Sequence, residues 1–331
     1  MQRKSLWAFI FLIPLGLLGN PFKIDFPVKK KITNEDYIEI QKKLKEIDIQ
    51  PILNEFYPSS PPKKFLKPWS SSLALKEDFY GRIGKALSQT LINPEKNQFP
   101  LQKLVKIGKG SDNCIVCYAS FNGRYVDLIQ NLPQKLETLG FNGYVYYRIG
   151  GFPNPTGKEI QYCAVPYCFK IFAMLEAHQM GFTKVLWIDS AFFPLKDPTP
   201  LFDWIEKEGS FLKLHESFTK YILPKTVEYI QSITGVDVLK SRYVSAQILG
   251  FDFSKPKTKE FIDKYYELVE LGLPFFSCFP EEYVFTAIIG QNPKIWKVQP
   301  YDQLVFPEIK LRGKTEDWVL KEGYFFLQKE H

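Results

Sequence analysis

The alternation of apolar and polar residues is most informative in the segment that leads to Asp189. Apolar residues recur at helical spacing over residues 169–180 and Gly181 follows them, which predicts an amphipathic helix that ends at the glycine. Residues 185–188 are then apolar without interruption, and a short run of this kind predicts a strand buried on both faces of a parallel sheet. Asp189 would lie at the carboxyl end of that strand, where open α/β sheets place ligand-binding groups.

Similar patterns occur on both sides of this segment. Residues 114–119 predict a buried strand, residues 128–139 a helix, and residues 144–147 a second strand. This order predicts two parallel strands joined by a right-handed crossover. Further strands and helices are predicted over residues 211–214, 243–253, 258–271 and 281–289. We therefore predict an α/β fold, in which helices flank a mostly parallel, Rossmann-like sheet.

The N-terminus has the layout of an export segment. Arg3 and Lys4 precede an apolar run over residues 6–18, which ends before Asn20-Pro21. A basic start followed by a short apolar run predicts a secretory signal, and an uncleaved signal-anchor is the alternative. In both cases the basic end stays inside, so we expect residues 1–22 to place the rest on the non-cytoplasmic side. The site would then face a secretory lumen, a periplasm or the cell surface.

Residues 23–110 are rich in Lys, Pro and Ser and predict a helical stem or scaffold. Thr33-Asn34-Glu35-Asp36, followed by apolar residues at helical spacing, predicts a capped helix. Residues 58–62 predict a linker, and residues 79–91 a second helix. No candidate chemistry lies here, so we expect residues 111–331 to form the functional domain.

Composition narrows the classes of partner. The chain has 331 residues, of which 45% are hydrophobic, and this is enough for a sizeable core. Its net charge of +7 suits a phosphate-bearing ligand or an anionic membrane surface. Zinc-finger spacing, an RNP-like aromatic motif and a long basic run are all missing from the sequence, so we expect no nucleic-acid partner.

The five cysteines offer one candidate disulfide. Cys114 and Cys117 lie on one predicted strand and do not suit each other as partners. Cys163 and Cys168 could pair after export, and because the number of cysteines is odd, at least one must stay unpaired within the chain.

Asp189 has two interpretations from spacing alone. It could close the strand with an Asx turn, continued by a proline-rich loop. It could instead hold a divalent cation or a sugar hydroxyl at the edge of the sheet.

The segment 185–203, which contains Asp189-Ser190-Ala191 and then Pro194-Leu195-Lys196-Asp197-Pro198, resembles the Asp-x-Asp segment of GT-A-type glycosyltransferases. It is most similar to the α-mannosyltransferase and glycogenin-like groups. The resemblance implies that paired acids bind Mn²⁺ or Mg²⁺, which grips the diphosphate of a nucleotide sugar. Here Ala191 replaces the second acid. One carboxylate and the donor phosphates could still hold a metal, or the site could be metal-free or inactive.

The resemblance covers residues 112–290 and implies a set of donor-site and acceptor-site candidates. Lys170 would approach the donor or, alternatively, face solvent, and Gln247 would line the sugar pocket. Glu281 or Glu282 would act beside the acceptor as a general base or a sugar-orienting acid, although two acids at a helix N-terminus also suit the helix dipole. His331 would be a second metal ligand beside Asp189. The loop after the first strand would contact the nucleoside through Tyr118, Ser120, Asn122 and Arg124.

Three functions follow from these features. The first is a GT-A-like glycosyltransferase that moves a hexose from a nucleotide-sugar or lipid-linked donor to a hydroxyl of a glycan, lipid or protein. The second, favoured by Ala191, is a non-catalytic sugar-binding or surface-interaction protein on the same scaffold. The third is a nucleotidyltransferase, which would need a Gly-rich basic loop after the first strand, and residues 120–124 contain one Gly and one basic residue.

Overall fold

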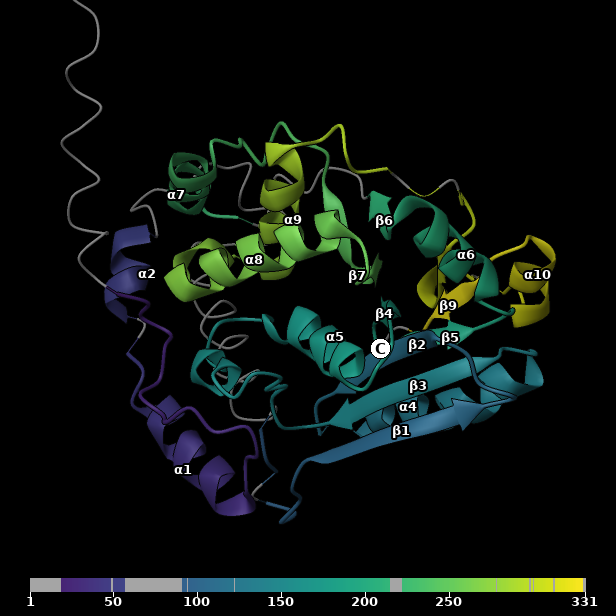
Figure 1. Ribbon diagram of the computed structural model, residues 1–331, viewed down its shortest axis with the longest axis horizontal. Coiled ribbons are helices and arrows are strands. Elements are labelled where there is room, and N and C mark those ends of the chain that lie inside the picture. The colour runs from purple at the N-terminus through teal and green to yellow at the C-terminus, as the bar shows by residue number, and fades with distance from the viewer. Residues whose placement is uncertain are drawn as a thin grey trace, which may run out of the picture.

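A computed structural model of the protein (Figure 1) describes residues 19–48, 50–56, 91–93, 95–121, 123–214, 222–277, 279–297, 299, 301–311 and 313–329. The apolar N-terminal run, the linker at 58–62 and nearly all of the helix predicted at 79–91 lie outside these residues, so export and anchoring stay predictions. Within the described part of the chain, every helix is too short or too polar to cross a bilayer.

A six-stranded mixed sheet forms the centre of the molecule. Its strands are ordered β1-β3-β2-β4-β7-β6. β2 is parallel to both β3 and β4, whereas β1 and β7 are antiparallel to their neighbours and β6 is antiparallel to β7. The predicted α/β fold and the parallel pair are thus confirmed. The strands are β1 (Leu101–Ile107), β2 (Asn113–Ala119), β3 (Gly143–Ile149), β4 (Lys184–Ile188), β6 (Ser210–Leu214) and β7 (Val244–Asp252).

Helices cover both faces of this sheet, and the side chains of β4 show why. Val185 and Trp187 pack into the layer that contains α5 (Phe169–Gln179), α8 (Pro256–Leu271) and α9 (Pro280–Gln291). Leu186 and Ile188 pack into the opposite layer, with α4 (Gly123–Thr138) and α6 (Thr199–Glu208). Successive side chains of a strand point to opposite faces, so a strand between two layers must be apolar throughout. Two further helices, α2 (Gln50–Phe56) and α7 (Pro224–Thr234), and the short turn η4 (Leu273–Phe275) lie at the margin of the first layer.

Parts of the predicted stem belong to the folded domain. β1 is an edge strand of the sheet. Ile24 and Phe26, which come earlier in the stem, are buried in the core. The predicted capped helix is α1 (Asn34–Lys45), and its capping box between Thr33 and Asp36 is formed. Burial alone would raise the pKa of Asp36, but the Lys29 ammonium at 2.6 Å and the Thr33 N–H at 2.7 Å hold it below its ordinary value.

A second, three-stranded sheet brings the C-terminal segment back to the loop after β4. Its order is β5-β9-β8, with β5 (Phe192–Pro194), β8 (Val305–Pro307) and β9 (Phe326–Gln328). Beyond β9, the N–H of Lys329 donates to the carbonyl of Ala191 at 2.9 Å. This main-chain hydrogen bond holds the Asp189-Ser190-Ala191 loop against a segment more than a hundred residues later in the chain. The remaining short elements are η3 (Glu159–Tyr162), η5 (Glu308–Lys310) and α10 (Glu316–Lys321).

The four described cysteines form no disulfide with one another. Cys114, Cys117, Cys163 and Cys168 are all buried free thiols, so the pairing of Cys163 with Cys168 considered above is not formed. Burial raises the pKa of the Cys163 thiol, which keeps it protonated and unreactive. Cys278 lies outside the described residues.

Candidate active site

Asp189 follows β4 directly and is held by side chains rather than by an Asx turn. Its N–H donates to the Gln247 carbonyl at 2.9 Å, which continues the pairing with β7. Its Oδ1 accepts hydrogen bonds from Lys170 Nζ and from Trp187 Nε1, each at 3.0 Å. The side chain is 29% exposed, so the carboxylate is fixed on one side and open on the other.

Lys170 does not face solvent. It lies in the first turn of α5, is buried, and its ammonium contacts three acceptors: Asp189 Oδ1 at 3.0 Å, Glu281 Oε1 at 2.8 Å and the Ala246 carbonyl at 3.0 Å. Burial lowers the pKa of Lys170, but the two carboxylates outweigh burial and leave the pKa above its ordinary value. The lysine is therefore charged.

Glu281 and Glu282 are adjacent at the start of α9 but have different partners. The carboxylate of Glu281 pairs with Lys170, and its side chain is 7% exposed. The carboxylate of Glu282 accepts from the Tyr243 hydroxyl and from the Ala246 N–H at 3.1 Å, which ties α9 to β7. Burial raises the pKa of both glutamates, and the charge of Lys170 opposes this shift in each. Glu281 thus belongs to the Asp189 cluster, and Glu282 is bound within the fold.

An irregularity in β7 supplies the main-chain groups of the site. From Leu212 to Leu214 in β6, the partner in β7 moves from Leu249 to Val244, so β7 bulges between these pairs. The bulge contains the Ala246 carbonyl that contacts Lys170 and the Gln247 carbonyl that contacts Asp189. β-Bulges often redirect groups beside active sites in this way.

The residues predicted at the loop after β2 lie in different surroundings. The Tyr118 side chain is buried, its hydroxyl donates to the Gly151 carbonyl at 3.0 Å, and its ring packs on Phe169. Ser120 is partly exposed at the end of the strand. Arg124 Nη2 lies 3.5 Å from Glu308, on the side of the second sheet. Asn122 and His331 lie outside the described residues, so their roles stay predictions.

The structure adds three residues to this edge of the sheet. Trp187 shares a face of β4 with Asp189, because residues two apart in a strand point the same way, and this spacing could have shown its role. Tyr125, partly buried in the first turn of α4, has a pKa raised by burial and by the charge of Asp189, while Arg124 opposes both. Lys213, near the carboxyl end of β6, is half-buried and forms no ion pair with another described residue. Burial lowers its pKa and Glu282 opposes that shift.

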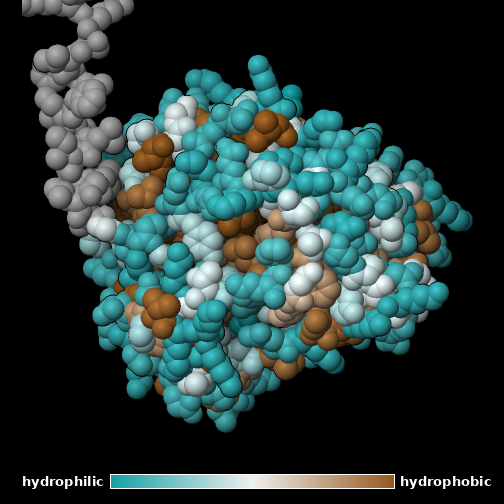
Figure 2. Space-filling model, viewed as in Figure 1, coloured by the Kyte–Doolittle hydropathy of each residue, from teal (hydrophilic) through white to brown (hydrophobic). Residues whose placement is uncertain are grey.

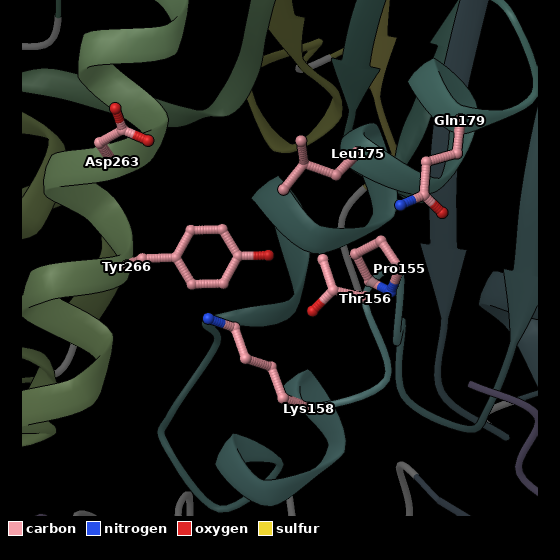
Figure 3. Close-up of a pocket in the computed structure, with 7 residues that line it drawn as sticks. All are labelled: Pro155, Thr156, Lys158, Leu175, Gln179, Asp263 and Tyr266. Atoms are coloured by element: carbon pink, nitrogen blue, oxygen red, sulfur yellow. The ribbon is translucent and has the colours of Figure 1, made fainter. Parts of the chain in front are cut away.

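A groove of about 360 Å³ lies elsewhere, at the far end of α5. Its lining residues on α5, Leu175 and Gln179, come five and nine residues after Lys170, so about 7 to 13 Å of axial rise separates them from the lysine. In Figure 3 the ammonium of Lys158 approaches the Tyr266 ring, whose centroid is 4.8 Å away. Figure 2 shows that the visible face is mostly hydrophilic, with some apolar groups gathered near its centre and others scattered around it. The groove is lined by Pro155, Thr156, Lys158, Leu175, Gln179, Asp263 and Tyr266.

Comparisons with known proteins add little to this geometry. No family model and no curated protein matches the sequence. The solved structures that match include mouse xyloside xylosyltransferase 1 in its apo form, with 10% identity, coverage of 62% of this chain and 72% of that chain, and a TM-score of 0.33. They also include the galactosyltransferase LgtC in complex with donor and acceptor sugar analogues, with 11% identity, coverage of 62% and 81%, and a TM-score of 0.29. At this level of similarity, function has to be argued from the site itself.

Proposed function

We propose that this chain is a glycosyltransferase that moves a hexose from a nucleotide-sugar or lipid-linked donor to a hydroxyl group of a glycan, lipid or protein. The main support is the partly exposed carboxylate of Asp189, held at the carboxyl end of β4 by the buried Lys170. Burying charged groups is costly, so a buried cluster at a ligand-binding edge is a functional-site candidate. A fixed carboxylate there suits hydrogen bonds from sugar hydroxyls.

Side chains of opposite sign have separate tasks in this proposal. Asp189 accepts hydrogen bonds from the donor sugar at its partly exposed carboxylate, while Glu281 acts as a positioning residue that holds Lys170. The leaving diphosphate gains negative charge as the glycosidic bond breaks, and nearby positive groups stabilise that charge. Lys213 and Arg124, both near this edge of the sheet, are the described basic residues suited to this task. Ser120 and Gln247, both partly exposed, are polar groups within the same region.

The Asp189→Asn variant tests the proposal. The amide keeps the shape of the side chain but loses the charge that Lys170 and Trp187 bind. We expect kcat/KM to fall about 100-fold or more, the size seen when a preorganised electrostatic group is removed. The assay is sugar release or transfer with a panel of nucleotide sugars and polyprenyl-phosphate sugars, which covers both donor classes.

Asp203→Asn is the matched control, because Asp203 is an exposed aspartate on α6. It should leave transfer unchanged, and circular dichroism should show that both variants are folded. Full activity in Asp189→Asn would refute the assignment of this site.

Ala191 supports a second candidate function, a non-catalytic sugar-binding protein on the same scaffold. A single exposed carboxylate can bind a sugar without activating a donor. Calorimetry with free oligosaccharides and with nucleotide sugars separates the two functions. Binding of oligosaccharides alone, with no turnover of any donor, would support the second function.

A further inference from the structure

We infer that this site binds its donor without a divalent cation, because the ammonium of Lys170 occupies the place beside Asp189 that a metal would need. The inference rests on the proposed function for its ligand, but the arrangement of Lys170 between two carboxylates is observed independently of it.

The described acidic groups do not form a metal-binding set. Mg²⁺ requires oxygen ligands at about 2.0–2.1 Å in near-octahedral geometry. Oδ1 of Asp189 already accepts two hydrogen bonds, from Lys170 and Trp187. At position 191 an alanine offers no side-chain oxygen, and its carbonyl accepts from the Lys329 N–H. Among the described residues no group of three or more His, Cys, Asp or Glu side chains could hold a metal ion. The residues that are described therefore fit a metal poorly.

Each N–H donor of the Lys170 ammonium has an acceptor. An ammonium has three N–H donors, and Lys170 has three acceptors: Asp189, Glu281 and the Ala246 carbonyl. It is also buried, so moving it aside would break all three of these contacts. A divalent cation bound to the other carboxylate oxygen of Asp189 would lie close to this positive charge and would be repelled by it. Asp189 is then left to contact the sugar directly rather than through a metal.

Removing the ammonium of Lys170 should allow a divalent cation to bind beside Asp189. In Lys170→Met the carboxylates of Asp189 and Glu281, which both lie within 3.0 Å of the same nitrogen, would remain without a cation between them. Two partly buried carboxylates facing each other attract a cation or a proton. We therefore expect this variant to bind Mn²⁺ at least tenfold more tightly than the wild-type chain does.

Lys184→Met is the matched control. Lys184 also lies between two acids, at 2.9 Å from Glu206 and 4.0 Å from Asp112, but these acids are about half exposed or more. Exposed carboxylates can turn into water, so this variant should gain no Mn²⁺ affinity.

The experiment has two readouts on the full chain. Calorimetry measures binding of uridine and guanosine diphosphates in EDTA and in Mn²⁺, and electron paramagnetic resonance measures binding of Mn²⁺ alone. We expect wild-type nucleotide affinity to agree within twofold in the two buffers, and Mn²⁺ binding to strengthen only in Lys170→Met. If Lys170→Met does not fold, Lys170→Gln replaces it, because its amide can still donate to one carboxylate.

The outcomes distinguish a failure of the metal-free binding inference from a failure of the proposed transferase function. Nucleotide binding that disappears in EDTA and returns with Mn²⁺ would overturn the inference and support the transferase. An unchanged Mn²⁺ affinity in a folded Lys170 variant would also overturn it. If neither nucleotide, nor any nucleotide sugar or polyprenyl-phosphate sugar of the panel, binds in either buffer, the proposed function fails. A gain of Mn²⁺ binding in Lys170→Met would still show that the lysine occupies the place of a cation.

Discussion

The two adjacent glutamates of α9 allow a sharp test of which side chain serves the fold and which serves the site. Glu282 is buried, and its two carboxylate oxygens accept from the Tyr243 hydroxyl and the Ala246 N–H. Glu282→Gln keeps the shape of the side chain but replaces one acceptor oxygen with an NH₂ donor. The NH₂ group would then face the Tyr243 hydroxyl or the Ala246 N–H, each of which needs an acceptor.

The size of the effect follows from these contacts. A buried hydrogen bond to a charged group contributes about 1.5–3 kcal/mol. Burial raises the pKa of Glu282, so the wild-type chain bears a desolvation cost that glutamine removes. We therefore expect a net loss of about 1–2 kcal/mol in the free energy of unfolding, which combines the lost bond with this relief. Sugar transfer per folded molecule should change by less than about tenfold, since Glu282 does not contact the Lys170–Asp189 pair.

Urea unfolding followed by fluorescence measures the stability, and the donor panel measures transfer. Tyr243→Phe removes the same bond from its other side, so the double variant should lose less than the sum of the single losses. A Glu282→Gln protein of wild-type stability that no longer transfers sugar would refute this reasoning, because it would show that Glu282 acts on the substrate.

Two further predictions concern the surroundings of the site and the N-terminal segment. Trp187→Phe removes the Nε1 donor to Asp189, so calorimetry should show about tenfold weaker binding of a nucleotide sugar, equivalent to about 1.4 kcal/mol; unchanged affinity in the folded variant would contradict it. Lys29 and Thr33 hold the pKa of Asp36 below its ordinary value of 3.8. The ionised Asp36 therefore stabilises the fold above pH 3.8, and this stabilisation is lost as the pH falls through the lowered pKa. Asp36→Asn should therefore cost about 1 kcal/mol at pH 6 and progressively less below about pH 4, in urea titrations at each pH; a difference that does not vary with pH would count against this account.

Several features of the protein follow from local sequence patterns. The apolar run before Asp189 indicates a strand between two layers, and Gly181 indicates the end of the helix before it. The capped helix α1 also follows from a short motif that begins at Thr33. These features are readable because the period of apolar residues and the chemistry of a cap involve neighbours in the chain.

The chemistry of the site depends on distant parts of the chain. Local sequence could not distinguish Glu281 from Glu282, because adjacent helical residues point about 100° apart and only packing decides which one meets Lys170. Lys170 is charged and buried only because α5, α9 and the bulge of β7 bring three acceptors to it. Sequence alone thus determined the α/β architecture and the place of Asp189 at a strand end, whereas tertiary structure decided which charges meet there, since a buried ion pair exists only where long-range packing excludes water.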